Sequence, residues 1–245
     1  MQPEEAFERL QALGFSDGDA QTLFDHFDEA ERRGKLGHGY SRIEWLATLP
    51  DLDPAAKPVL AAEYPGFEYW EGRGALGYLT LAAICERLAA NPPWPARVVS
   101  AAGCFPTGML GYWVRGLAEA GLVALLTATS PPRLAHPDGG PPLVGTNPLA
   151  IGVPNPEGEP LVVDVSMGKV TYGDVLAGHA SAEDLVAFGG DQAYKAFALA
   201  LGLQLLVESC VGEDYGAFLV VVAPEFQPVP ELRARAVGVR LPGDR

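Results

Sequence analysis

The stretch Gly145-Thr146-Asn147-Pro148-Leu149-Ala150-Ile151-Gly152-Val153-Pro154 places a polar turn directly before an apolar run. A second apolar run follows, Leu161-Val162-Val163-Asp164-Val165-Ser166, and it ends in a carboxylate and a hydroxyl. Short apolar runs bounded by turn residues predict β-strands, here Leu149–Val153 and Leu161–Val165. Open sheets collect ligands where polar groups follow strand ends, so this stretch predicts a sheet with a ligand site beside it.

Helices and strands alternate on both sides of this stretch. Apolar spacing predicts helices over residues 3–13, 19–33, 41 to about 49, 76–90, 110–120 and 192–209, and strands over 98–101, 122–129 and 217–222. This alternation predicts an α/β fold with a mixed β-sheet layered with helices. We expect an N-terminal helical part over residues 1–60 and a mixed-sheet α/β domain over 61–245. The N-terminal helices either form a separate lobe or pack on the same core.

Composition narrows the class of protein. The 245 residues carry a formal net charge of −14, which argues against nucleic acid or an anionic membrane as a partner. The three cysteines, Cys85, Cys104 and Cys210, are widely spaced and predict reduced thiols and no metal site. The acidic N-terminus differs from a signal peptide, and the apolar runs 117–128 and 196–207 stop short of a bilayer span. We therefore expect a cytoplasmic protein.

A glycine-rich segment, Gly72-Arg73-Gly74-Ala75-Leu76-Gly77, opens a predicted helix and matches the dinucleotide-binding pattern of Rossmann folds. That pattern also needs a buried strand before it and an acidic residue about twenty positions later. Residues 64–71 make a poor buried strand, and no acidic residue lies around Arg97. We therefore expect a non-Rossmann fold, in which these glycines let the helix entry pack against another element.

The segment Gly37-His38-Gly39-Tyr40-Ser41-Arg42 combines a histidine between glycines with an arginine in the first turn of a helix. Such an arginine can bind a carboxylate bidentately, and the histidine can exchange a proton. The alternative is a loop histidine beside a surface arginine. Spacing alone does not decide between them.

Two further loops precede helices. The backbone amides of the loop that begins at Cys104 are candidates to bind phosphate. Cys104 itself is a candidate nucleophile, or more simply a small buried thiol. Gly189 and Gly190 precede a helix that carries Lys195 in its first turns. This segment predicts either a site that binds an anion or a lysine that is solvated on the helix surface. His26, His136 and His179 lack metal-ligand spacing, and we expect no catalytic role for them.

Taken in order, these segments resemble the type 2 malate/L-lactate dehydrogenase family, also called L-sulfolactate dehydrogenase-like, which includes ureidoglycolate dehydrogenase and Δ1-piperideine-2-carboxylate reductase. Gly37-His38-Gly39-x-x-Arg42 is similar to its Ser-His-Gly-x-x-Arg, and Gly145-Thr146-Asn147-Pro148 matches directly. The resemblance covers nearly the whole chain and also includes residues 104–122, Gly173-Asp174, Gly189-Gly190…Lys195 and residues 240–243.

The resemblance implies a homodimer with its active site at the subunit interface. It also implies NADP- or NAD-dependent hydride transfer at C2 of a small 2-oxo, 2-hydroxy or cyclic imino acid. Carried over by position, His38 is the proton donor, Asp174 belongs to its proton relay, and Arg42 with Thr146 binds the substrate carboxylate. The implied cofactor contacts are Cys104, Phe105, Thr107, Gly108, Asp164, Val165, Ser166, Gly190 and Lys195.

Several positions depart from the family pattern. Gly37 stands for the family serine, Cys104 for a histidine, Leu46 for an aromatic residue, and Ala196 for the glycine after Lys195. The chain is also shorter than typical members between Val175 and Gly189. Two hypotheses follow: an active NAD(P)H-dependent reductase, or a catalytically impaired relative that binds nucleotide or carboxylate without turnover.

Overall fold

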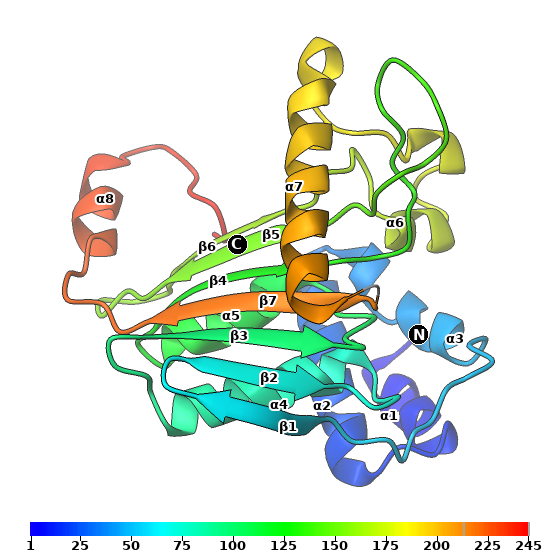
Figure 1. Cartoon of the computed structure of the whole chain (residues 1–245), viewed down its shortest axis with the longest axis horizontal. Helices are drawn as coiled ribbons and strands as arrows, with labels where there is room; N and C mark the ends of the chain where they lie inside the picture. The colour runs from blue at the N-terminus through cyan, green and yellow to red at the C-terminus, as the bar shows by residue number, and fades with distance from the viewer. Residues whose placement is uncertain (213, 245) are drawn as a thin grey trace.

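The computed structural model describes residues 1–212 and 214–244, and a mixed seven-stranded sheet runs through its centre (Figure 1). The strands lie in the order β1-β2-β3-β7-β4-β5-β6, and only the β2–β3 pair is parallel. Their bounds are β1 Val59–Tyr64, β2 Phe67–Glu71, β3 Ala96–Ala102, β4 Val123–Ala128, β5 Leu149–Val153, β6 Leu161–Val165 and β7 Gly216–Val222. The predicted α/β fold with a mixed sheet is confirmed.

Helices cover one face of this sheet, and their apolar sides form the main core with it (Figure 1). The helices with residues in this core are α1 Pro3–Ala12, α2 Asp17–Arg32, α3 Ser41–Leu46, α4 Gly77–Ala90 and α5 Leu110–Glu119, and the other helices are α6 Tyr172–Leu176, α7 Ala193–Val211 and α8 Val229–Arg235. Leu10 and Phe27 of the N-terminal helices belong to the same buried cluster as Leu126 of β4. The N-terminal helices therefore pack on the same core as the sheet, while a domain boundary near residue 60 stays a prediction.

The strand β2 lies where we expected a poor strand, so that expectation was wrong. This strand contains Glu68, a charged residue that is almost fully buried. Its carboxylate accepts hydrogen bonds from Trp70 Nε1 at 2.9 Å and from the guanidinium groups of Arg87 and Arg97. A buried carboxylate paired in this way loses little on leaving water, so the strand tolerates it.

The glycine-rich segment packs as predicted. A Cβ atom at Gly77 would lie 2.7 Å from Pro106 O and 2.8 Å from the carbonyl carbon of Cys104. A Cβ atom at Gly72 would lie 3.0 Å from the carbonyl carbon of Gly103. These glycines bring the entry of α4 against the loop after β3. Residues 72–77 do not line the cavity that contains His38 and Arg42, in agreement with a non-Rossmann fold.

The opposite face of the sheet is only partly covered. Alternate residues of β4, β5 and β7 are half-buried there, and the last turns of α7 pack on this face through Val207 and Val211. The rest of α7 extends beyond the sheet and packs one side on a small second cluster that includes Leu134 and Phe197 (Figure 1). We call α7, with the segments packed around its outer part, the arm.

Among the described residues one helix, over residues 190–211, is long and apolar enough to cross a membrane by length and composition alone, and 28% of its apolar stretch is buried. The run 196–207, predicted to stop short of a bilayer span, is only part of this helix, which reaches that length with its flanking residues. Its outward side exposes Leu199 by 53% and Leu205 by 54%.

Candidate functional site

A cavity of about 480 Å³ lies between the N-terminal helices, the loop after β3 and the segment after β6. Its size falls within the range of about 300–1,000 Å³ that is common for small-molecule sites. The predicted site residues that line it are His38, Arg42, Phe105, Thr107, Gly108, Thr146, Asp164, Ser166 and Asp174. Residues that lie up to 136 positions apart in the chain thus converge on one hollow, as the sequence hypothesis requires.

His38 and Asp174 come together through two glycines that touch. A Cβ atom at Gly37 would lie 2.6 Å from the backbone nitrogen of Asp174 and closer still to its carboxylate. A Cβ at Gly173 would meet the Gly37 carbonyl group. The glycine that stands for the family serine therefore lets α6 approach, and the Asp174 carboxylate occupies the space that a side chain at position 37 would need.

The Asp174 carboxylate is held by the turn before α6. Its Oδ2 atom accepts hydrogen bonds from the backbone nitrogen and the hydroxyl of Thr171, both at 2.8 Å, while Thr171 caps α6. This reciprocal capping fixes the direction of the carboxylate. Oδ1 is left facing Gly37, beside His38.

Arg42 lies in the cavity wall and is only 7% exposed, so the alternative of a surface arginine is wrong. Its guanidinium group stacks on Trp45, 3.8 Å from the ring centroid, one turn later on α3. Arg42 Nε is buried without a hydrogen-bond partner, and the hydroxyl of Tyr78, which also lines the cavity, faces the Arg42 guanidinium group. Buried polar atoms are normally paired, so Arg42 Nε points to a polar ligand.

The pKa of His38 is lowered to about 4, first by burial and then by the positive charge of Arg42, while Asp174 acts in the opposite direction. The imidazole is therefore neutral near pH 7 in the free chain. An anion bound to Arg42 would offset that positive charge and raise the pKa of His38.

His26 lies behind the lining residues Gly108 and Met109, and its lack of a catalytic role stays a prediction. The fully buried ring accepts a hydrogen bond from the Met109 backbone nitrogen at 3.0 Å and stacks on Trp113. Burial lowers its pKa well below the usual value, which keeps Nε2 available as an acceptor. A Cβ at Gly108 would strike this ring, so His26 and Gly108 together fix the loop.

Asp164 joins the cavity to α5. Its Oδ2 atom accepts a hydrogen bond from the backbone nitrogen of Gly111 at 2.8 Å, in the first turn of the helix. Burial raises the pKa of Asp164, and this hydrogen bond opposes the rise. The residue thus ties the end of β6 to the helix entry that follows the 104–109 loop.

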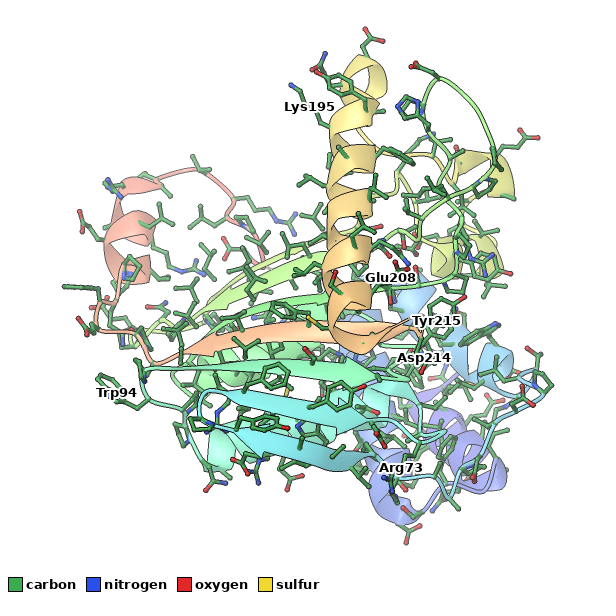
Figure 2. All side chains as sticks on the ribbon, in the orientation of Figure 1. Arg73, Trp94, Lys195, Glu208, Asp214 and Tyr215 are labelled. Atoms are coloured by element: carbon green, nitrogen blue, oxygen red, sulfur yellow. The ribbon has the colours of Figure 1, made fainter. Side chains whose placement is uncertain are left out.

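Four predicted cofactor contacts lie outside the cavity lining: Cys104, Val165, Gly190 and Lys195. Cys104 is fully buried against Gly77, and burial raises the pKa of its thiol, which agrees with the buried-thiol alternative. Val165 is 40% exposed between two lining residues. Lys195 lies near the outer end of α7, whereas Glu208 lies near the end beside the sheet (Figure 2).

The Gly-Thr-Asn-Pro turn connects the cavity to the arm. Thr146 lines the cavity, and the next residue, Asn147, is fully buried with a φ of 26°. Asn147 Nδ2 donates hydrogen bonds to Ala200 O at 2.9 Å and to Gln204 Oε1 at 2.7 Å, both on α7. The turn is therefore anchored on the helix that carries Lys195.

Sequence reasoning missed several lining residues, above all Trp45, Tyr78, Lys35 and Arg133. Trp45 could have been predicted as a lining residue, because residues three apart on a helix share a face and Arg42 was already a predicted site residue. Tyr78 lies in a helix predicted only from its apolar spacing, and no element or motif was predicted around Arg133. No local pattern marks such residues, since the tertiary fold alone turns them toward the cavity.

Comparisons with known proteins identify the family of this chain. A sequence profile described as Malate/L-lactate dehydrogenase matches residues 4–189. The (2R)-3-sulfolactate dehydrogenase (NADP(+)) of Chromohalobacter salexigens is 32% identical over 181 residues, 72% of this chain and 54% of that protein. The Δ1-pyrroline-2-carboxylate/Δ1-piperideine-2-carboxylate reductase of Pseudomonas aeruginosa is 31% identical over 178 residues, 68% of this chain and 51% of that protein.

Solved structures show the same fold. The Δ1-piperideine-2-carboxylate reductase of Pseudomonas syringae pv. tomato superposes with a TM-score of 0.81 at 25% identity, covering 99% of this chain and 89% of that one. The malate dehydrogenase of Pyrococcus horikoshii gives 0.78 at 20% identity, with 95% and 77% covered. The two curated relatives named above are matched over only about half of their own length.

Proposed function

The chain belongs to the malate/L-lactate dehydrogenase family, and on that premise we propose an NAD(P)H-dependent oxidoreductase that transfers a hydride to or from C2 of a small 2-oxo or 2-hydroxy acid or a cyclic imino acid. The observation that carries the proposal is the buried Arg42, whose Nε has no hydrogen-bond partner, in one cavity with His38. Hydride transfer to such an acid needs a cation that orients the carboxylate and a proton source near the forming alkoxide or amine.

In this proposal Arg42 and Thr146 bind the substrate carboxylate. Stacking on Trp45 uses one face of the guanidinium group and leaves its edge free, where N–H donors can bind both carboxylate oxygens. Burial strengthens this interaction, because little water competes for the donors. The carboxylate is then held at a fixed distance from His38.

His38 exchanges the proton. A carboxylate on Arg42 removes part of the charge that lowers the pKa of His38, so substrate binding itself favours the protonated imidazole. Asp174, fixed by Thr171, stabilises that imidazolium and relays the proton. Reduction draws on this proton, and oxidation returns it.

NADP or NAD fits the part of the cavity lined by Phe105, Thr107 and Gly108 together with Asp164 and Ser166. When bound, the nicotinamide supplies or accepts the hydride. The chain's own contribution is a rigid wall, because His26 fixes the loop and Asp164 fixes the helix entry behind it. Cys104 supports this wall from behind, and we assign it no chemical step.

We further propose a homodimer in which the arm packs against a second copy and brings Gly190 and Lys195 to that copy's active site. Within one chain these residues lie outside the cavity, while the outward side of α7 exposes an apolar stripe that includes Leu199, Leu205 and Leu206. Such a stripe beside a half-buried apolar sheet face favours burial against another protein surface. A cytoplasmic location and the absence of a nucleic-acid partner stay predictions from composition.

The test is binding and turnover measured separately. Titration with NADPH, followed by its fluorescence, should saturate. NADPH oxidation should then appear with at least one acid among pyruvate, oxaloacetate, sulfopyruvate and piperideine-2-carboxylate. Absence of NADPH and NADH binding would refute the proposal. Binding without turnover would favour the impaired relative, which has no support from the comparisons because the curated relatives they name are dehydrogenases and reductases.

A further inference from the structure

A tyrosine in the first turn of α4, Tyr78, lines the same cavity and has no role in the reaction described above. Its side chain is fully buried, and its hydroxyl faces the guanidinium group of Arg42. Burial raises the pKa of Tyr78, and the positive charge of Arg42 only partly opposes that rise. The phenol therefore keeps its proton near neutral pH and can donate it in a hydrogen bond.

Close contacts hold the ring of Tyr78 in place. It packs edge-on against two rings of α2, with centroids 4.9 Å from that of His26 and 5.2 Å from that of Phe27. A Cβ atom at Gly108 would also strike the ring, so the loop after β3 reaches it only because residue 108 is a glycine. Because the side chain is already ordered, little conformational entropy remains to be lost when its hydroxyl binds a ligand.

Tyr78 lies between the two groups of residues that the proposed reaction uses. Its ring contacts Gly108 in the wall assigned to the cofactor, and its hydroxyl faces Arg42, which is assigned to the substrate carboxylate. Hydride transfer requires the nicotinamide and the carbon that accepts the hydride to be adjacent. A side chain that spans both parts of the cavity is therefore placed to contact the substrate.

The Tyr78 hydroxyl and the Arg42 guanidinium group cannot satisfy each other completely. A guanidinium group carries only N–H donors, so it can donate to the phenol oxygen but cannot accept the phenol proton. Within the part of the chain that the structure describes, the Tyr78 hydroxyl has no hydrogen-bond acceptor, and Arg42 Nε has no partner. Two buried donors at one place in the cavity therefore call for an acceptor that a ligand must supply.

We propose that Tyr78 is a further substrate-binding residue, whose hydroxyl donates a hydrogen bond to the same carboxylate that Arg42 binds. The two oxygens of a carboxylate offer enough lone pairs to accept from a guanidinium group and a phenol at once. The identification of that carboxylate as part of the substrate rests on the proposed function, whereas binding of a carboxylate here needs no turnover. Donors from two elements, α3 and α4, restrict the rotation of the bound acid.

Tyr78→Phe tests the hydroxyl alone, because it keeps the ring and its contacts. With NADPH and an acid that the wild type reduces, KM for the acid should rise roughly 10- to 100-fold, the loss expected for a hydrogen bond to a charged group. The value of kcat should change less than KM, and the Kd of NADPH should stay within about 2-fold. Tyr78→Leu removes the ring as well, so it should also weaken NADPH binding.

Tyr112→Phe is the matched control, since the Tyr112 ring also packs edge-on against His26, at 4.8 Å, but lies outside the cavity lining. Its KM for the acid should equal that of the wild type.

Calorimetric titration with oxamate, a carboxylate shaped like pyruvate that accepts no hydride, gives a second readout without turnover. Tyr78→Phe should weaken oxamate binding, and its loss should not add to that of Arg42→Lys in the double variant, with a coupling above about 2-fold. This result supports the carboxylate contact even if no acid is reduced, an outcome that would count against the proposed function alone.

Four results would overturn the proposal. Unchanged KM and unchanged oxamate affinity in Tyr78→Phe would leave the hydroxyl without a ligand contact. Equal weakening of NADPH and acid binding in that variant would make Tyr78 a general support of the cavity wall. A fall in kcat with KM unchanged would place the hydroxyl at the reacting oxygen and not at the carboxylate. Absence of oxamate binding by the wild type would remove the carboxylate site itself.

Discussion

The cavity and the arm differ in how completely one chain supplies them. In the cavity, His38, Arg42 and Asp174 are placed by backbone contacts so close that glycine is required, as at Gly37 and Gly173. On the arm, α7 packs one side on a small cluster and exposes Leu199 and Leu205 on the other. The difference separates residues that one chain brings into a single cavity from residues that, under the proposed dimer, reach a site only on a second copy.

The largest expected effect lies in the cavity. His38→Ala removes the proposed proton donor and should lower kcat about 10²- to 10⁴-fold, the range typical of general acid–base residues. The matched control is His136→Ala on the arm, an exposed ring against Phe197, which should stay within about 2-fold because surface substitutions change little. Steady-state kinetics with NADPH measures both, and unchanged kcat in His38→Ala would remove the residue from the mechanism.

Restoring the family serine tests how tightly the cavity is packed. Gly37→Ser puts a Cβ into the space of Asp174, so we expect a loss of roughly 1–3 kcal/mol in the free energy of unfolding, as for overpacked cores. Activity should fall with it, because His38 and Asp174 are displaced. Chemical denaturation measures the stability. The control is Gly116→Ser, an exposed position on α5 with nothing within 4 Å of a Cβ atom; equal stability of the two variants would contradict the close contact.

The arm is tested through its apolar stripe. Leu199→Glu combined with Leu205→Glu should convert a dimer into a 25.9 kDa monomer, measured by light scattering, because charges at the core of an interface are desolvated on association. Trp94→Glu, on an exposed side chain well separated from the arm, should leave the dimer intact (Figure 2). A wild-type monomer that floats with lipid vesicles would instead give the apolar helix a membrane role.

The smallest expected effect is the uptake of protons when a carboxylate ligand binds. The pKa of His38 is about 4 in the free chain, below its usual value, and a carboxylate on Arg42 raises it. Binding of oxaloacetate should therefore take up a fraction of a proton, and affinity should increase as the pH falls from 7 toward 5. Calorimetry in two buffers of different ionisation enthalpy measures the uptake. His38→Gln should abolish it, and proton release by the wild type would contradict the coupling.

Much of the fold follows from local patterns in the sequence. The bounds of β5 and β6 are those predicted from two apolar runs, and α1, α4 and α5 differ from the predicted ranges by one residue at an end. The strand β2 escaped detection because Glu68 is paired with arginines distant in sequence. Long-range pairing of this kind leaves no local signal.

The site was predictable where residues cluster in short segments and unpredictable where the fold turns isolated side chains inward. His38 and Arg42 share one such segment, and both line the cavity. Tyr78 and Arg133 stand alone in their segments, and only the tertiary structure brings them to the same wall. Lys195 was singled out for its helix, yet one chain leaves it on the arm (Figure 2).

Asn147 links these two regions, and its place in the turn determines how the proposed activity should depend on protein concentration. Its side chain binds α7 at Ala200 and Gln204, while its neighbour Thr146 faces the cavity. If a second copy holds α7 in place, subunit dissociation loosens the turn as well. Specific activity should then rise with enzyme concentration, and diluted enzyme should show a lag before reaching its steady rate.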